Sequence, residues 1–228
     1  MAARWPAHRA KAVAALALAL ITVTAGSGNE EPDSGGPQVD VLGSMLASES
    51  ELNTIMGTTD LRSKTALRVP ANLDADEHAS RPECVVVIGN AMDWVYRDSG
   101  YRQFRENLYS DDGIGLEVDQ AVAKFDNPAA ARKLVARTLD LWHRCAGETL
   151  TLTTDGDSTP EAYVLAQPSV IDGIDVTHEE SPDDPENVSR RAIMVIDDIV
   201  VDVRISGHGI DDGKAVTLAK TIGGRNAL

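Results

Sequence analysis

Aromatic residues are scarce in this sequence, making up 4% of its 228 positions. Stacking platforms for bases or sugars would therefore have to be built from very few rings. Basic residues are also in the minority, because 21 Lys and Arg stand against 36 Asp and Glu and leave a formal net charge of −15. Such a surface repels nucleic-acid phosphates and anionic lipid headgroups, so we expect neutral, cationic or proteinaceous partners and no nucleic acid.

Catalytic and metal-binding motifs are missing as well. The histidines at positions 8, 78, 143, 178 and 208 form no HExxH pair, and no GxSxG elbow occurs. The stretch from Asp155 to Glu161 has the alternating oxygens of a calcium loop, but it lacks the glycine and the distant glutamate of an EF-hand, so we interpret it as a solvated turn. We expect no catalytic residue, no metal site and no cofactor.

An acidic run could hold a hard cation or contact a basic partner, although such runs usually face water. We expect it to form an exposed loop, since two prolines interrupt it. Its members are Glu179, Glu180, Asp183, Asp184 and Glu186.

The N-terminal segment has the pattern of an export signal. Basic residues between positions 4 and 11 precede an apolar run from Ala12 to Ala25, which is too short to span a bilayer comfortably. The site before Gly26 also resembles a bacterial lipobox, but Ser27 stands where the lipid-bearing cysteine would be, and serine cannot form the thioether. We predict a signal peptide at 1–26, a disordered acidic spacer at 27–38 and one folded domain at 39–228.

The strongest helix signal lies between Asn127 and Gly147. Asn127 can cap the free N–H groups of the first turn, Pro128 suits the first helical position, and Gly147 suits the left-handed residue that ends a helix. Between them, apolar residues recur at spacings of three and four, which predicts one buried face. The predicted buried residues are Ala131, Leu134, Val135, Thr138, Leu141, Trp142 and Cys145.

The remaining pattern mixes helices and strands and predicts an α+β fold. Further helices are expected at 48–57, where Ser48 and Glu51 have capping-box spacing, at 82–96 and from 212 to 222. Strands are expected at 66–69, 101–109, 116–125, 149–154, 163–167 and 170–176, and the alternation at 191–205 indicates a hairpin.

Three aromatic residues cluster around the expected turn between the 82–96 helix and the following strand. They are Trp94, Tyr96 and Tyr101. They could edge a pocket, but packing in the core is the commoner role of such rings.

Cys84 and Cys145 are the only cysteines. An even, low count in an exported chain favours a disulfide, which would close a loop of 61 residues and contribute about 4 kcal/mol by the chain-entropy estimate. The alternative is a reactive thiolate beside a base. His143 is near Cys145 in sequence, but side chains two residues apart on a helix point to different faces, so we predict the Cys84–Cys145 bridge.

Four segments, in order, resemble the PknH-like extracellular sensor domain family and its stand-alone, lipoprotein-like mycobacterial members. The segments are LNTIMG, RPECVVVIGNAMDWVYRDSGYRQF, QAVAKFDNPAAARKLVARTLDLWHRCAGETLTL and RRAIMVIDDIVVDVRIS. The resemblance covers about residues 39–223. It implies an antiparallel sheet with helices packed on it, a cleft for an unidentified ligand and a place in the actinobacterial envelope. This chain departs from the family at Ser189, where a cysteine of a second disulfide would stand, and at Ser27.

From these observations we expect an exported, non-catalytic, sensor-like domain that binds a small molecule or an envelope component in the cleft. We expect it to be secreted or held at the envelope, with the signal segment bringing it close to the membrane. Two alternatives remain. An envelope hydrolase would be indicated by a pocket of converging His, Asp and Ser side chains, and a protein-interaction module by a flat apolar patch. The sequence does not identify the ligand-binding residues.

Overall fold

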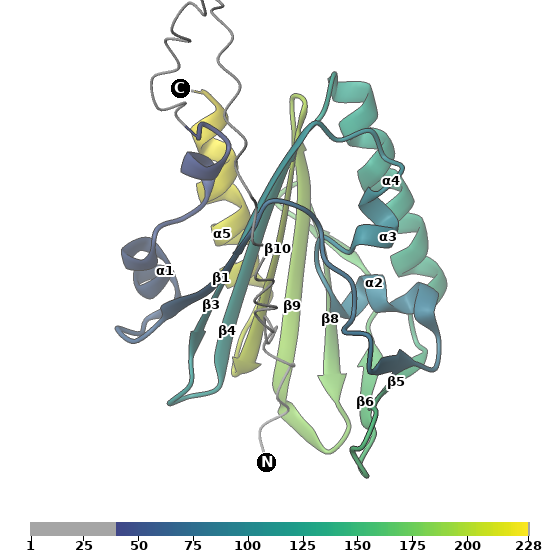
Figure 1. The fold of residues 1–228 in the computed structure, drawn as a ribbon. Helices are drawn as coiled ribbons and strands as arrows, with labels where there is room; N and C mark the ends of the chain where they lie inside the picture. Colours follow the sequence, from purple (N-terminus) through teal and green to yellow (C-terminus); the bar gives the residue numbers. More distant parts are fainter. Residues whose placement is uncertain (1–39, 228) are drawn as a thin grey trace, which may run out of the picture.

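In the computed structural model, which describes residues 40–227, a strongly bent antiparallel sheet carries helices on both sides (Figure 1). The sheet order is β1-β3-β4-β10-β9-β8-β6-β5-β2, with β7 paired to β8. The strands are β1 (Arg62–Leu67), β2 (Glu77–Ala79), β3 (Gln103–Asp111), β4 (Leu116–Lys124), β5 (Thr149–Thr154), β6 (Glu161–Leu165), β7 (Ser169–Ile171), β8 (Ile174–Ser181), β9 (Asp184–Ile196) and β10 (Ile199–His208).

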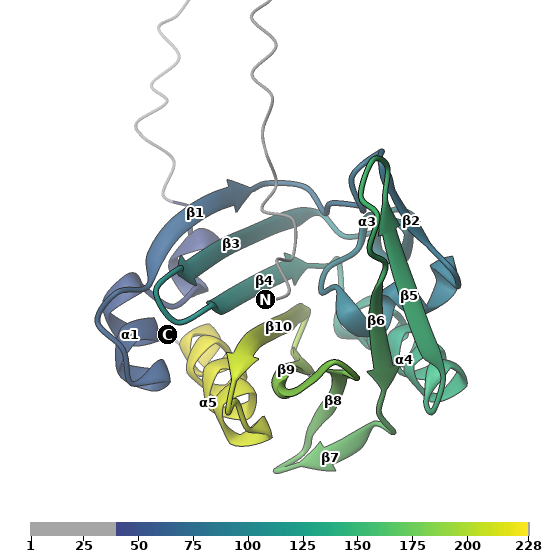
Figure 2. The same cartoon turned by 90° about the horizontal axis from the view of Figure 1, so that it is seen from below.

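The helices form two groups. One group consists of η1 (Gly43–Met45), α1 (Glu49–Met56), α5 (Asp212–Gly223) and η3 (Gly224–Ala227). The other consists of η2 (Pro82–Cys84), α2 (Val85–Ile88), α3 (Asp93–Tyr96) and α4 (Pro128–Cys145). Figure 1 shows α1 and α5 on one side of the sheet and α2, α3 and α4 on the other. Figure 2 shows how the sheet bends, so that β1, β3 and β4 lie at an angle to β5 and β6 with β8, β9 and β10 between them. The α+β architecture predicted from the sequence is confirmed.

The sheet has a hydrophobic core on each face because its central strands alternate. On β10, Val201, Val203 and Ile205 face the core that contains α1 and α5, whereas Val200 faces the core that contains α2 and α4. β10 pairs with β4 on one side and with β9 on the other, so it lies in the middle of the sheet. The predicted hairpin at 191–205 is β9 and β10, which are longer than expected at both ends.

Helix α4 forms as the sequence predicts. The Asn127 side chain accepts a hydrogen bond from the Ala130 backbone N–H at 3.0 Å, and Pro128 occupies the first turn. Gly147 has a φ of 81°, the left-handed conformation that favours glycine. The buried residues of α4 are those predicted, namely Ala131, Leu134, Val135, Thr138, Leu141, Trp142 and Cys145. The Ser48–Glu51 capping box at the start of α1 is also confirmed.

The Cys84–Cys145 disulfide is present and ties η2 to the end of α4. The two Cα atoms are 5.6 Å apart, and both cysteines are buried. That Cα separation lies within the usual range for a disulfide. The structure therefore supports the bridge over the alternative of a reactive thiol.

The helix predicted at 82–96 is wrong as one continuous element. It is divided into η2, α2 and α3, with Gly89 extended and Ala91 at a φ of 46° between them. The interruption has a tertiary cause, because side chains from the sheet bond the backbone of this segment. Arg191 donates to the Val86 and Gly89 carbonyls, and the Ala91 N–H donates to Asp202 at 3.0 Å.

The acidic loop predicted at 179–186 is also wrong. β8 continues to Ser181 and β9 begins at Asp184, so most of this run belongs to two paired strands. Glu179 is 2% exposed and lies opposite Ser189, whereas Asp183 at the turn faces water. The acidic pattern alone could not separate the one buried member from its exposed neighbours.

The predicted signal peptide at 1–26 and spacer at 27–38 lie outside the described residues. Within residues 40–227, no helix is long and apolar enough to cross a membrane.

Candidate functional site

A band of polar side chains interrupts the sheet face that packs against α2 and α4. We call it the polar band. It crosses five neighbouring strands, and most of its side chains are buried. Its members are Glu106 on β3, Asp119 on β4, Asp202 and Arg204 on β10, Ser189 and Arg191 on β9, and Thr177 and Glu179 on β8.

Strand register places Arg204 at the centre of the polar band. It lies directly opposite Asp119 on β4 and directly opposite Arg191 on β9. Ser189 and Glu179 face each other across β9 and β8. The register thereby brings residues that are far apart in the sequence onto one surface. Asp119 lies on one side of the Arg204 guanidinium and Glu179 on the other.

The deepest part of the band is an ion pair between Arg191 and Asp202. Both side chains are 1% exposed, and the guanidinium donates to the carboxylate through Nε at 2.9 Å and Nη2 at 2.7 Å. Asp202 also accepts from the Tyr96 hydroxyl at 3.2 Å, and the Arg191 guanidinium lies over the Trp142 ring at 5.1 Å. Every strong polar group here has a partner, so this pair serves to hold the α2–α3 segment in place.

Beside this ion pair is a small cavity that we call the acid pocket. Its volume is about 20 Å³, which is room for about one water molecule. Asn72, Asn90, Glu106, Asp119 and Arg204 contribute its polar lining. Asn90 and Glu106 are each 6% exposed. Three buried atoms in this lining have no hydrogen-bond partner, namely Asn90 Nδ2, Glu106 Oε2 and Asp119 Oδ1.

Asn90 owes its place in the acid pocket to the interrupted helix. The left-handed conformation of Ala91 costs about 1–2 kcal/mol for a residue with a side chain. It is held there by the bond from its own N–H to Asp202. Backbone strain of this kind concentrates at functional sites.

The two carboxyl groups of the acid pocket favour their protonated forms. Burial raises the pKa of Glu106 well above its ordinary value, and the neighbouring Asp119 charge raises it further. Burial also raises the pKa of Asp119 to about 6, although the neighbouring Asn90 amide and Glu106 carboxyl group oppose the rise. The pair therefore retains a proton at pH values where exposed acids have lost theirs.

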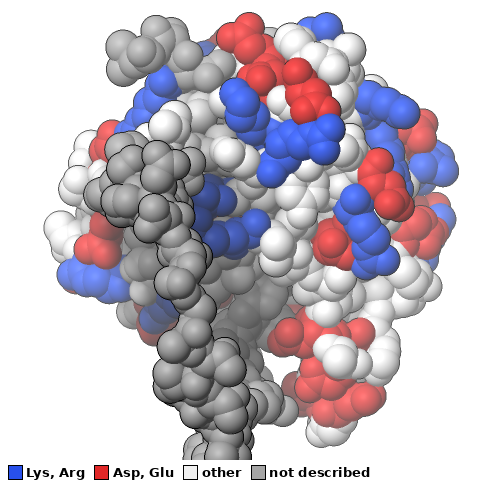
Figure 3. Space-filling model, turned by 45° about the horizontal axis from the view of Figure 1, so that its top comes forward, with Lys and Arg blue, Asp and Glu red and all other residues white. Residues whose placement is uncertain are grey.

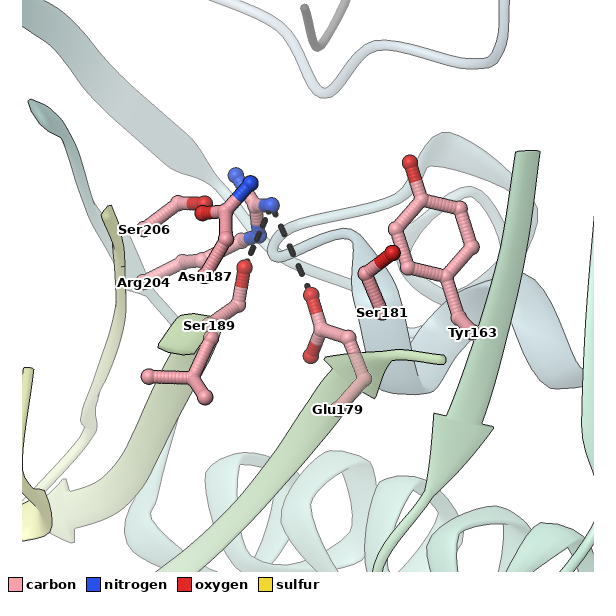
Figure 4. Close-up of a pocket in the computed structure, with 8 residues that line it drawn as sticks. Tyr163, Glu179, Ser181, Asn187, Ser189, Arg204 and Ser206 are labelled. Atoms are coloured by element: carbon pink, nitrogen blue, oxygen red, sulfur yellow. Dashed lines mark hydrogen bonds and ion pairs between the residues drawn. The ribbon is translucent and has the colours of Figure 1, made fainter. Parts of the chain in front are cut away.

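On the other side of Arg204 lies a second cavity of about 20 Å³, which we call the serine pocket. Arg204 Nη2 donates to Ser189 Oγ at 2.6 Å and lies 3.5 Å from Glu179 Oε1. Figure 4 shows Arg204, Asn187 and Ser206 on one side of the pocket, Ser181 and Tyr163 on the other, and Glu179 between them. The Glu179 Oε2 atom is buried without a hydrogen-bond partner, and burial raises the pKa of this carboxyl group.

The histidines and the acidic turn considered in the sequence analysis lie outside the two polar pockets. His78 pairs with Asp155 at 3.1 Å and His208 with Asp184 at 2.9 Å, both on the surface, and neither polar pocket contains a histidine. The turn at 155–159 is exposed, as predicted, and no group of three or more potential metal ligands occurs among residues 40–227.

The aromatic cluster belongs to the core. Tyr96 is buried and packs edge to face against Tyr101 and Phe104, with ring centroids 6.3 Å and 5.8 Å away. Trp94 lies partly buried at the same core. The interpretation as core packing is confirmed.

Sequence reasoning missed the members of the acid pocket. The alternation along β10 puts Asp202 and Arg204 on the face opposite Val201 and Val203. What the alternation does not reveal is that most of these polar side chains are buried. One signal could have pointed to a buried polar site. Asp202 and Arg204 are an acid and a base at alternate positions of β10, and charged residues are rare on a central strand unless they are paired.

Figure 3 shows one face of the outer surface, with its charged side chains coloured. Lys and Arg side chains alternate there with Asp and Glu, and acidic side chains gather toward the lower edge of the view. Two wider hollows exist elsewhere, of about 310 Å³ beside Asp40 and Arg105 and of about 260 Å³ between α1 and α5. The acid and serine pockets are separate and small, so a ligand-sized cleft remains a prediction.

Comparison with known proteins identifies relatives of this chain. The model of the PknH-like extracellular domain family matches residues 37–225. Serine/threonine-protein kinase PknH of Mycobacterium bovis is 28% identical over 186 residues, covering 79% of this chain and 30% of that protein, and PknH of Mycobacterium tuberculosis is also 28% identical. The chain thus spans less than a third of these kinases. The crystal structure of the extracellular domain of PknH from M. tuberculosis matches with a TM-score of 0.74 and 25% identity, covering 82% of this chain and 95% of that one.

Proposed function

This chain belongs to the PknH-like extracellular domain family, and on that premise we propose that it is a non-catalytic, sensor-like domain that binds a small molecule or an envelope component on its polar band. Family membership makes an extracytoplasmic location the natural setting. The proposal includes two locations, in which the protein is either secreted or held at the envelope through its N-terminal segment.

One observation carries the binding role. Buried polar atoms without partners lie on both sides of Arg204, in the acid pocket and in the serine pocket. Each such atom costs about 1–3 kcal/mol in a folded protein, and an unsatisfied buried group in a native structure calls for an explanation. A ligand that completes these hydrogen bonds recovers that free energy only when it binds, so the arrangement suits recognition.

The proposed role is limited to recognition. The match with this chain covers 29–30% of the length of the kinase relatives. The kinase activity in their names is therefore not part of the proposal for this chain. A signal that starts with a ligand on the polar band would pass to another protein through a change in this domain or its surface.

No specific observation favours either alternative function, the envelope hydrolase or the protein-interaction module. A hydrolase of the expected kind needs a base beside a nucleophile, whereas the hydroxyl groups of the serine pocket have no histidine among their neighbours. A protein-interaction module needs a contiguous apolar patch. The large exposed hydrophobic residues of the described chain lie on separate turns and strands, at Val41, Val69, Ile114, Val164 and Val170.

Native mass spectrometry of the protein isolated from its own producing cells tests this proposal. We expect extra mass that leaves on denaturation, and the denatured mass also reports leader removal, any lipid and the disulfide. The Asn90→Ala variant should retain less of the extra mass than the Asn127→Ala variant, which alters an exposed amide at the start of α4. A wild-type protein that carries no extra mass would argue against the binding role.

A further inference from the structure

The unpartnered atoms of the acid pocket define what kind of group can complete it. Asn90 Nδ2 is a donor, whereas Glu106 Oε2 is an acceptor. A hydroxyl group accepts one hydrogen bond and donates another, so it can serve both. An ammonium group only donates and a carboxylate only accepts, while a phosphate brings a full negative charge. The volume of about 20 Å³ admits a single group of that size.

The charges around the acid pocket point the same way. An anion would lie against the carboxyl oxygens of Glu106 and Asp119, which repel it whenever either group is ionised, and the Arg204 guanidinium in the same lining repels a cation. A neutral group with a local dipole avoids both repulsions. The pocket is therefore suited to an uncharged hydroxyl group.

The serine pocket has the same chemical character. Ser181 and Ser206 contribute hydroxyl groups and Asn187 an amide, each of which can donate and accept, whereas the Tyr163 hydroxyl donates to Glu161 at 2.6 Å and can only accept. Glu179 Oε2 adds one more buried acceptor without a partner. This second lining also favours a neutral, hydrogen-bonding group over a single charge.

We propose that the polar band recognises a neutral polyhydroxylated ligand, a saccharide or a cyclic polyol, which covers Arg204 and places one hydroxyl group in the acid pocket and another in the serine pocket. Arg204 lines both pockets, so one molecule reaches both by spanning a single side chain. No aromatic ring lines the acid pocket, and Tyr163 is the only one in the serine pocket. Recognition then depends on hydrogen bonds more than on ring stacking.

This inference rests on the proposed function, and its test separates the two. The full chain, labelled with nitrogen-15, is titrated with myo-inositol and with sucrose and followed by amide NMR spectra. Three matched probes lack one part of the required chemistry, namely 1,4-diaminobutane as a cation, inorganic phosphate as an anion and 1,4-dioxane as an acceptor without hydroxyl groups. Each probe is raised to its solubility limit at constant pH and ionic strength.

The expected result is a saturable shift of the Asn90 side-chain amide and of the Ser189 backbone amide with at least one of the two polyols, and with none of the other probes. Asn90→Ala and Ser181→Ala should each weaken that binding about fivefold to tenfold, the effect of one lost hydrogen bond. Glu180→Gln, next to Ser181 on β8 and outside both pocket linings, should leave it unchanged.

Shifts at these amides with diaminobutane or phosphate alone would overturn the inference, and so would the absence of any shift. The mass released in native mass spectrometry separates this failure from that of the proposed function. A released ligand without hydroxyl groups overturns the polyol inference and leaves a binding domain. A protein without any released ligand and without any shift overturns both.

Discussion

The buried Asp119 carboxyl group predicts an unusual dependence of stability on pH. Its pKa is raised from 3.8 to about 6, mainly by burial, so between these values the folded state holds a proton that the unfolded chain has released. The stabilisation from that proton is fully present below the unfolded pKa and is lost as the pH rises through the folded pKa. Glu106 also has a raised pKa and extends the loss to higher pH.

The size of the effect follows from the shift of about two pKa units. At about 1.4 kcal/mol for each pKa unit, Asp119 alone lowers the free energy of unfolding by about 3 kcal/mol as the pH rises from below 3.8 to well above 6. Carboxyl groups in ion pairs act in the opposite direction. Glu51, whose pKa is lowered to about 2 chiefly by the hydrogen bond from Arg225, loses its contribution only in stronger acid. The two effects therefore separate along the pH axis.

Guanidinium chloride unfolding at intervals between about pH 4.5 and about pH 7.5 measures this dependence, with the disulfide intact. The wild-type free energy of unfolding should fall across that window. Asp119→Asn, which keeps the shape of the neutral acid, should remove most of the slope, whereas Asp157→Asn in the exposed turn should keep it. A wild-type slope of zero, or an unchanged slope in Asp119→Asn, would refute the assignment of a buried, protonated pair.

Three further predictions concern the parts of the fold that hold the site. Arg191→Met leaves the Asp202 charge buried without its partner and should lower the free energy of unfolding by about 3–5 kcal/mol in denaturant titrations. The Arg191→Met/Asp202→Leu double variant should recover part of that loss. A double variant that recovers none of it would contradict the ion-pair account. Replacing Cys84 and Cys145 together with alanine should cost about 4 kcal/mol in the same assay, and an unchanged midpoint would show that the bridge contributes nothing. Ala91→Gly should raise thermal stability by about 1 kcal/mol because it relieves the left-handed strain; destabilisation would mean that the alanine conformation is not strained.

Local signals in the sequence predicted the elements whose geometry is set locally. Helix α4 has its cap, its first-turn proline, its stripe and its terminal glycine within one segment, so each boundary could be located. The β9–β10 hairpin likewise carries its alternation and its turn in adjacent residues. Even the bridge between Cys84 and Cys145 needed only a count, because the chain has no other cysteine.

The failures occur where distant residues decide the local structure. Residues 82–96 have helical spacing throughout, yet the backbone turns at Gly89 because Arg191 takes carbonyl groups that a continuous helix would have used. Glu179 lies in a run that looks solvated and is buried because β6 and β9 flank β8. The acid pocket depends on both events, so its residues could not be identified before the sheet was assembled.

Ser189 connects one of the two departures from the family pattern with the site itself. The resemblance places a cysteine of a second bridge at this position, whereas here the serine hydroxyl accepts a hydrogen bond from Arg204 at 2.6 Å. A sulfur engaged in a disulfide is only a weak acceptor, so it could not fix the guanidinium in the same way. The serine helps to hold Arg204 between the two pockets, where it lies opposite Asp119 and close to Glu179. A serine at this position therefore contributes to the polar band directly, which a cysteine in a disulfide could not do.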